Sequence, residues 1–328
     1  MFGIKILGTG SYVPAFSADN NALAAIMDTN DEWIRTRTGI ARRGYSSGET
    51  TFEMGAAAAK RALAAANITA DKIGLIVAVT ITNDFATPSL SCMIQREIGA
   101  TCAAFDVVAA CSGFVYGLDT AKRFLETDKN LDYVLVAASD TLSRIVDFSD
   151  RSSAILFGDG AAAVVITRDE RTYGSFLGAD GGGSVHLYAK NAPRYNPVTE
   201  RYTPFNEGFP GKDNVIIQNG QEVYKFAVNA LQKASIAAAT SAGIDINDID
   251  MFLPHQANLR IIRAAAKGLK IPDEKFFVNI DRHGNTSGVS IPLALDEAIS
   301  EGKVKRGDKL CFVGFGAGLT YGAVVLEY

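Results

Sequence analysis

One pattern of helix-like and strand-like segments occurs twice along this chain, and it is the feature that most limits the fold. In the first half, the helical pattern of residues 51–68 leads into the strand-like run KIGLIVAVTI at 72–81. In the second half, the helical pattern of residues 223–244 leads into the strand-like run DIDMFLP at 248–254. Helices that alternate with strands are typical of α/β proteins.

The ends of the two halves are also alike. Residues 158–167 (GDGAAAVVIT) and residues 314–328 (GFGAGLTYGAVVLEY) each combine a glycine-containing turn with a strand of small, apolar residues. The sequence therefore predicts an α/β protein built by internal duplication.

Composition limits the class of protein and its partners. The 328 residues are 48% hydrophobic and 21% charged, enough for one large core or two domains of ordinary size. The net charge of −4 argues against a nucleic-acid partner, so any basic site must be local. The first residues, MFGIKILGTG, lack the pattern of a signal peptide, and GLIVAVTI is too short to cross a bilayer. We therefore expect a cytoplasmic protein with no membrane partner.

The cysteines and histidines lack the spacing of a disulfide scaffold or a metal site. The four cysteines, at positions 92, 102, 111 and 311, form no CxxC pair, and the three histidines lie far apart at 186, 255 and 283. We expect reduced thiols and no metal.

Cys111 lies where a strand-like run ends and a helical pattern begins. Phe105, Val107 and Val108 are typical of a buried strand, and apolar residues recur at helical spacing from Phe114 to Leu125. A helix N-terminus favours an anion, so this position predicts a nucleophilic thiolate. The alternative is a structural cysteine, because free cysteines usually behave as small buried hydrophobic residues.

Two further polar side chains occupy similar junctions in the second half. His255 follows the strand-like MFLP, and Asn285 lies in HGNTSG ahead of another helical pattern. Ligands of parallel α/β sheets gather at the carboxyl ends of strands, so Cys111, His255 and Asn285 can converge although they are distant in sequence. Such a set supplies a nucleophile and two neutral groups for a developing negative charge.

The segment from residue 178 to residue 220 separates the halves. It contains GADGGGS and four of the nine prolines, and it is longer than most connections within a compact domain. An ordered cover over a site and a mobile surface insertion explain this composition equally well.

Several segments together resemble one enzyme family. DTNDEWIRTRTGI, AFDVVAACSGF, DRSSAILFGDGA, LPHQANLRII, DRHGNTSG and FGAGLTYGA are similar to 3-oxoacyl-[acyl-carrier-protein] synthase III, the condensing enzyme that initiates bacterial fatty-acid synthesis. The resemblance covers nearly the whole chain. It implies a thiolase fold with duplicated α-β-α-β-α layers, whose halves would span residues 1–172 and 173–328, and a homodimer.

The resemblance also implies a reaction without a cofactor. In the reaction that the resemblance implies, an acyl group would pass from coenzyme A to Cys111, and malonyl on acyl carrier protein would then lose CO2 and attack the acyl-enzyme. His255 and Asn285 would stabilise the enolate. The backbone N–H groups of Cys111 and Ala317 would form the oxyanion hole, with Ala317 in a position where the family has glycine. Alanine keeps the backbone N–H but lacks the conformational freedom of glycine at positive φ, so the orientation of the Ala317 N–H depends on the conformation of this loop.

Further residues receive roles by the same resemblance. Coenzyme A would bind at Trp33, Arg37, Arg151 and Asn258, in keeping with base stacking on an aromatic ring and arginine pairing with phosphate. A core tryptophan beside solvated arginines is the alternative. The acyl pocket would include Thr87, contributed across the dimer, together with Leu142 and Phe157. Since acetyl-selective relatives carry phenylalanine at the position of Thr87, threonine predicts room for a longer or branched acyl chain.

A basic face follows the HQAN motif. Arg260, Arg263, Lys267 and Lys270 recur at helical spacing, so they share one face of a helix. This face suits an acidic partner, although charged runs are usually just solvated. The resemblance implies that acyl carrier protein docks on this segment, at Gln256, Ala257, Asn258, Leu259, Arg260 and Arg263.

Other functions remain as alternatives. A Cys-His-Asn thioester hydrolase or protease uses the same residue types in the same order, although the CGxCW-like cysteine signature is absent. A non-enzymatic partner of a condensing enzyme would lack the nucleophile, which this chain keeps. A related condensing enzyme of specialised metabolism is the alternative within the same fold.

Overall fold

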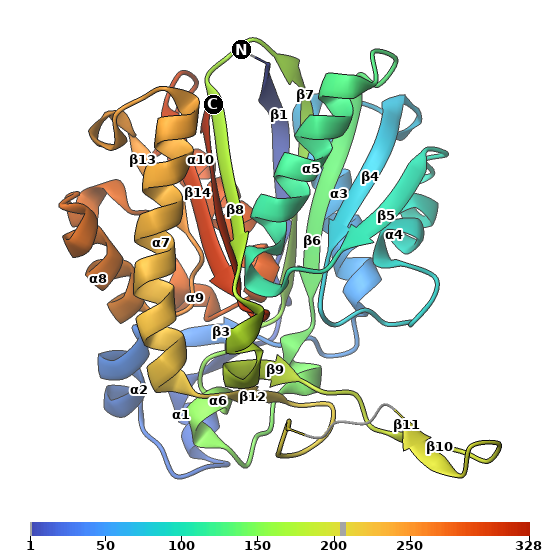
Figure 1. Cartoon of the computed structure of the whole chain (residues 1–328), viewed down its shortest axis with the longest axis vertical. Helices are drawn as coiled ribbons and strands as arrows, with labels where there is room; N and C mark the ends of the chain where they lie inside the picture. Colours follow the sequence, from blue (N-terminus) through green and yellow to red (C-terminus); the bar gives the residue numbers. More distant parts are fainter. Residues whose placement is uncertain (1, 204–207) are drawn as a thin grey trace.

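Two mixed β-sheets form the centre of the computed structural model, which describes residues 2–203 and 208–328 (Figure 1). The first sheet has five strands in the order β1-β7-β6-β4-β5. The second sheet has four strands in the order β13-β14-β15-β8. The strands of the first sheet are β1 (Gly3–Tyr12), β4 (Ile73–Val79), β5 (Ala103–Val107), β6 (Tyr133–Asp140) and β7 (Gly160–Asp169). Those of the second are β8 (Tyr173–Ala179), β13 (Met251–Pro254), β14 (Lys309–Gly316) and β15 (Thr320–Glu327).

The two sheets repeat one topology. In the first sheet, β1 and β6 are antiparallel to β7, and β6 is parallel to β4. In the second sheet, β8 and β14 are antiparallel to β15, and β14 is parallel to β13. The parallel ladder between β4 and β5 corresponds to a single parallel bridge between Phe252 and Phe276. The predicted duplication is therefore confirmed.

Helices complete a five-layered arrangement. Helices α3 (Thr51–Ala66) and α4 (Leu90–Ile98) cover the outer face of the first sheet, and α7 (Gly220–Ala242) and α8 (Leu259–Leu269) cover the outer face of the second. Helices α5 (Gly113–Thr127) and α10 (Ser290–Ser300) lie between the sheets and share one buried core with both. The α-β-α-β-α layering predicted for the chain is confirmed.

Equivalent glycines let the outer helices approach the sheets closely. A Cβ atom on Gly8 of β1 would lie 2.3 Å from the backbone nitrogen of Ala66 at the end of α3. A Cβ atom on Gly174 of β8 would lie 2.2 Å from the backbone nitrogen of Ala242 at the end of α7. Because Cβ atoms cannot approach backbone this closely, both halves depend on glycine at this contact.

Short elements gather at one end of the two sheets. They are β2 (Ser17–Asp19), β3 (Arg42–Gly44), α1 (Asn20–Ala24), α2 (Asp31–Thr38), α6 (Arg151–Ala154) and α9 (Ile280–His283). The fully buried Arg43 connects them, since its guanidinium donates to Asn20 Oδ1 at 2.9 Å and to Ile155 O at 2.7 Å. Arg43 thus holds α1 and the end of α6 together at this end of the sheets.

The segment between the halves divides into two parts. Strands β9 (Leu187–Ala189) and β12 (Ile216–Gln218) pair with each other and lie against the body of the protein. Strands β10 (Arg194–Asn196) and β11 (Arg201–Thr203) form a hairpin that extends away from it. Residues 204–207 of this segment lie outside the described residues. In the described part of the chain, no helix has the length and apolar character needed to span a membrane.

Candidate active site

Cys111 lies in a tight 3-10 turn, η2 (Ala110–Ser112), directly before helix α5. Ala110 has a φ of 45°, a left-handed conformation that costs free energy for a residue with a Cβ atom. The end of β14 presses against this turn, because a Cβ atom on Gly316 would lie 2.5 Å from the Cys111 nitrogen. The two halves of the molecule therefore meet at the cysteine.

Burial dominates the electrostatics of Cys111. The residue is only 8% exposed, and burial raises the pKa of its thiol to about 12. Cys111 lies directly before a helix as expected, but its burial opposes the thiolate that a helix N-terminus favours. A thiol with this pKa is protonated at neutral pH.

His255 follows strand β13 and is buried and neutral. Burial lowers the pKa of its imidazole to about 3, and the ring packs edge-on against Phe315. Its Nδ1 lies 2.7 Å from the hydroxyl oxygen of Ser290, the first residue of α10. That hydroxyl has one hydrogen and a second acceptor, Ser287 O at 2.9 Å, so its rotation decides which ring nitrogen carries the proton.

The amide of Asn285 is held with a known orientation. Its Oδ1 accepts a hydrogen bond from the Ser287 N–H at 2.9 Å, which leaves the Nδ2 donors to face the cavity. Its backbone is fixed on both sides, since its N–H donates to Leu156 O and its carbonyl accepts from Gly158. Asn285 is thus a rigidly placed neutral donor.

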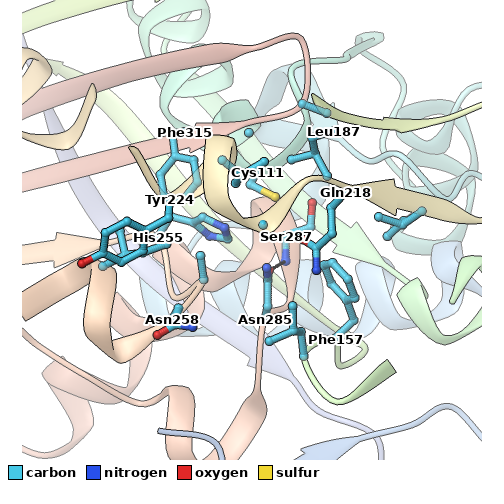
Figure 2. A pocket seen from close by; sticks show the side chains of 18 of the residues that line it. Cys111, Phe157, Leu187, Gln218, Tyr224, His255, Asn258, Asn285, Ser287 and Phe315 are labelled. Atoms are coloured by element: carbon cyan, nitrogen blue, oxygen red, sulfur yellow. Dashed lines mark hydrogen bonds between the residues drawn. The ribbon is translucent and has the colours of Figure 1, made fainter. Parts of the chain in front are cut away.

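One cavity of about 610 Å3 brings these side chains together (Figure 2). Cys111 and His255 come from strand-to-helix junctions as expected, whereas Asn285 lies between helix α9 and the 3-10 turn at Ser287–Val289, where it makes an isolated parallel bridge with Phe157. The other predicted residues that line the cavity are Trp33, Arg37, Leu142, Phe157, Ala257, Asn258, Arg260 and Ala317. The predicted residues outside this lining are Thr87, Arg151, Gln256, Leu259 and Arg263.

Aromatic and cationic groups surround the mouth of the cavity. The guanidinium carbons of Arg37 and Arg151 lie 4.5 Å and 5.1 Å from the centre of the Trp33 ring, within cation–π range. Asn258 caps helix α8 by accepting from the Arg260 N–H at 2.9 Å, and it donates to Arg37 O at 3.1 Å. The mouth therefore combines an indole ring, two guanidinium groups and an amide that joins α8 to α2.

The basic face of α8 is exposed, but one residue of the predicted carrier-docking segment is buried. Arg260, Arg263, Lys267 and the following Lys270 are all exposed. Gln256, in contrast, is 1% exposed, and its amide donates to Pro254 O and Phe277 O and accepts from Asn279 N–H. The prediction that Gln256 contacts the carrier is wrong, because its side chain is committed to this buried network.

The apolar wall of the cavity includes residues that the sequence analysis missed. Leu142 and Phe157 are buried in this wall as expected, whereas Thr87 is exposed and lies off the cavity of its own chain. Strands β9 and β12 add Leu187, Ile216 and Gln218, and α7 adds Tyr224. The apolar residues in HLYA (186–189) and VIIQ (215–218), within the proline-rich segment, are the sequence pattern that could have indicated this part of the wall. Part of that segment is therefore a cover over the site.

Ala317 fits its loop without strain at its own position. It is not among the described residues with positive φ, whereas the following Gly318 has a φ of 142°. The glycine that this loop needs for conformational freedom is therefore Gly318, and alanine at 317 keeps its backbone N–H. In the described part of the chain, no group of three or more His, Cys, Asp or Glu side chains is arranged to hold a metal ion.

The five layers and the cavity at the ends of both sheets define a thiolase-fold enzyme. Comparison with known proteins specifies its family. The descriptions "3-Oxoacyl-[acyl-carrier-protein (ACP)] synthase III" and its C-terminal region match residues 105–183 and 239–328. The chain is 43% identical to the β-ketoacyl-[acyl-carrier-protein] synthase III of Clostridium acetobutylicum, over 100% of this chain and 99% of the relative.

Solved structures agree with the sequence comparison. The 3-oxoacyl-[acyl-carrier-protein] synthase III of Aquifex aeolicus superposes with a TM-score of 0.90 at 42% identity, covering 99% of this chain and 100% of that one. The enzyme of Thermus thermophilus superposes with a TM-score of 0.91 at 39% identity, covering 98% of each chain. This chain belongs to the 3-oxoacyl-[acyl-carrier-protein] synthase III family. It is a condensing acyltransferase that initiates fatty-acid synthesis, and these relatives do not favour a hydrolase or a synthase of specialised metabolism.

The contact between Gly316 and Cys111 gives a first prediction. Gly316→Ala should slow acylation of Cys111 by at least about tenfold, because the added Cβ must displace the turn that holds the thiol and its N–H. Rapid-quench mass spectrometry with acetyl-CoA measures this rate. Ala317→Gly is the control and should acylate at nearly the normal rate. Normal acylation of Gly316→Ala would mean that this close contact is not needed.

Proposed function

We propose that this enzyme transfers an acyl group from coenzyme A to Cys111 and condenses it with malonyl on acyl carrier protein. The products are 3-oxoacyl-carrier, free coenzyme A and CO2. The observation that carries this assignment is the convergence of Cys111, His255 and Asn285 in one cavity with Trp33 and Arg37 at its mouth. The Trp33 ring offers a base-stacking surface, and the guanidinium groups of Arg37 and Arg151 suit the phosphates of coenzyme A.

In the first half-reaction, Cys111 sulfur attacks the thioester carbonyl and the coenzyme A thiolate leaves. The tetrahedral oxyanion accepts hydrogen bonds from the backbone N–H groups of Cys111 and Ala317, which fixed backbone can supply without reorganisation. The apolar wall that contains Leu142 and Phe157 then holds the acyl chain.

In the second half-reaction, malonyl loses CO2 and negative charge develops on its thioester oxygen. Asn285 Nδ2–H and His255 Nε2–H donate to that oxygen, and the resulting carbon nucleophile attacks the acyl-cysteine. Because the pKa of His255 is lowered to about 3, the imidazole acts as a neutral donor. Ser290 supports this role when its hydroxyl donates to Nδ1, since the ring proton then occupies Nε2.

We also propose that the enzyme is a homodimer. Strand β5 is at the edge of its sheet, and the adjacent Val108 and the nearby Phe124 are 77% and 43% exposed, which suits pairing with a second copy in a homodimer. Thr87 would reach the partner's cavity in such a dimer. The division at residues 172 and 173, the cytoplasmic location and the absence of a cofactor stay predictions.

The roles of the three side chains predict separable defects. Cys111→Ala should abolish the acyl-enzyme while some malonyl decarboxylation survives, because His255 and Asn285 are intact. His255→Ala and Asn285→Ala should each lower condensation by about 10²–10³ while Cys111 still acylates, since each removes an oxyanion donor. Acyl-peptide mass spectrometry and CO2 release measure the two half-reactions. If the His255 or Asn285 variant loses acylation and continues decarboxylation, that residue supports acylation of Cys111 and not decarboxylation.

The basic face of α8 predicts a defect confined to the carrier. Arg260→Glu should raise the KM for malonyl-carrier by about tenfold and leave acyl transfer from coenzyme A nearly unchanged. The defect should shrink in high salt, because exposed charges are screened. Lys60→Glu, on the exposed face of α3, is the charge-matched control. Equal damage to both half-reactions by Arg260→Glu would assign this face to folding or to coenzyme A.

Thr87 predicts the starter preference. Butyryl- or isobutyryl-CoA should prime as well as acetyl-CoA, because threonine leaves room in the pocket for a longer acyl chain. Each methylene group of that chain that is buried there stabilises binding by about 0.8 kcal/mol. Thr87→Phe should narrow the preference to acetyl-CoA, and Thr87→Ser should not. Competition between acyl-CoAs, read by mass spectrometry of Cys111, measures the ranking. If Thr87→Phe leaves the ranking of the acyl-CoAs unchanged, Thr87 does not line the acyl pocket.

A further inference from the structure

Asp140 is a fully buried carboxyl group to which the reaction above gives no role. It is the last residue of β6 and is 1% exposed. Its Oδ1 accepts three hydrogen bonds, from Thr80 Oγ1 at 2.9 Å, Ile81 N at 2.8 Å and Thr82 Oγ1 at 2.9 Å. Its Oδ2 is buried and has no hydrogen-bond partner among the described residues. A structural anchor would need only the first oxygen, so the second one requires an explanation.

Ser287 lies between this carboxyl group and the cysteine. The 3-10 turn η7 (Ser287–Val289), which begins at this residue, packs against β6 and against η2, and Ser287 lowers the pKa of both the Asp140 carboxyl and the Cys111 thiol. In the described part of the chain, however, the hydroxyl has no partner at regular hydrogen-bond geometry. Figure 2 shows Ser287 beside Cys111 in the pocket. A rotatable hydroxyl therefore stands between a proton donor and a proton acceptor.

The local backbone holds Ser287 in this place. Its φ is 55°, a left-handed conformation that is strained for serine, and its N–H is held by Asn285 Oδ1. The next residue, Gly288, packs on the cysteine turn, because a Cβ atom there would lie 3.2 Å from Ala110 O. Strain of this kind is kept only where the surrounding contacts impose the position.

We propose that Asp140 is a positioning residue that accepts the thiol proton of Cys111 through the Ser287 hydroxyl. This inference rests on the proposed role of Cys111 as acyl acceptor. As the bond between Cys111 sulfur and the acyl carbon forms, the thiol proton moves to Ser287 Oγ and the Ser287 proton moves to Asp140 Oδ2. Coenzyme A leaves as a thiolate and takes a proton from water. Asp140 is then a neutral carboxylic acid for the lifetime of the acyl-enzyme.

Condensation returns the proton. When the carbon nucleophile attacks the acyl-cysteine, Cys111 leaves as a thiolate, which regains its proton from Asp140 along the same path. Protons balance over the cycle, since the one taken up by coenzyme A is the only net uptake. The site never holds two buried negative charges on Asp140 and Cys111 together, which low-dielectric surroundings would penalise strongly.

The electrostatics of the site agree with this path. Burial raises the pKa of Asp140 to about 6, so it is a carboxylate at neutral pH, and its charge raises the pKa of Cys111. Because the thiol is the weaker acid, its proton moves only as sulfur attacks. The groups that face Asp140 are the thiol from η2, the Ser287 hydroxyl from η7 (Ser287–Val289), and the hydroxyls and amide that follow β4. Asp159, beside the neighbouring β7, directs its carboxylate to Ser46 and Ser143.

The test is the pH dependence of Cys111 acylation by acetyl-CoA, measured by rapid quench and peptide mass spectrometry. The wild-type rate should rise with pH through about pH 6, as Asp140 becomes able to accept a proton. Asp140→Asn and Ser287→Ala should each be at least about tenfold slower at neutral pH and lack this rise. The double variant should be no slower than the slower single variant, because both changes break one path.

Thr80→Val is the matched structural control. It removes one hydrogen bond to Asp140 Oδ1 but leaves the path through Oδ2, so its rate should keep the rise and move it to higher pH. If Asp140→Asn fails to fold, Ser287→Ala decides alone. A Ser287→Ala or Asp140→Asn enzyme with the wild-type rate and pH rise would overturn the relay. Wild-type enzyme that is never acylated at Cys111 would instead overturn the proposed function.

Discussion

Burial of ionisable groups is the constraint on which the chemistry of this site depends. Burial raises the pKa of Cys111 to about 12, lowers that of His255 to about 3 and raises that of Asp140 to about 6. The resting site therefore contains a neutral thiol and a neutral imidazole. Such a site favours a reaction in which negative charge develops only transiently and is stabilised by hydrogen-bond donors in fixed positions. Both thioester attack and malonyl decarboxylation develop such a charge on a thioester oxygen.

The duplication explains how one chain builds this environment. Each half brings the carboxyl ends of its parallel strands to the same place, so β5 and β6 supply Cys111 and Asp140 and β13 supplies His255. Helices α5 and α10 fill the space between the sheets and share one buried hydrophobic core with both. The close contact between Gly316 and Cys111 joins the two halves at the reacting atom.

Much of this organisation could be predicted from sequence, because it depends on local patterns. Repeated helix and strand periodicity predicted the two sheets. Cys111, His255 and Asn285 converge as expected, although Asn285 follows the short helix α9 and not a strand. Properties set by tertiary surroundings could not be predicted. The helix N-terminus suggested a thiolate, but only the packed structure shows how far burial opposes it. The HQAN motif gave no sign that Gln256 points inward, and nothing local marked Asp140 as facing Ser287.

The role of Cys111 as acyl acceptor can be tested by following one acyl group on the wild-type enzyme. The protein would be exposed to isotopically labelled acetyl-CoA, digested and analysed by mass spectrometry, before and after addition of malonyl-acyl carrier protein. We expect about one label per chain on the peptide that contains Cys111, and complete transfer of this label to the carrier as the 3-oxoacyl product. A label on Cys92, Cys102 or Cys311, or label released as free acetate instead of carrier product, would show that Cys111 is not the acyl acceptor of a condensing reaction.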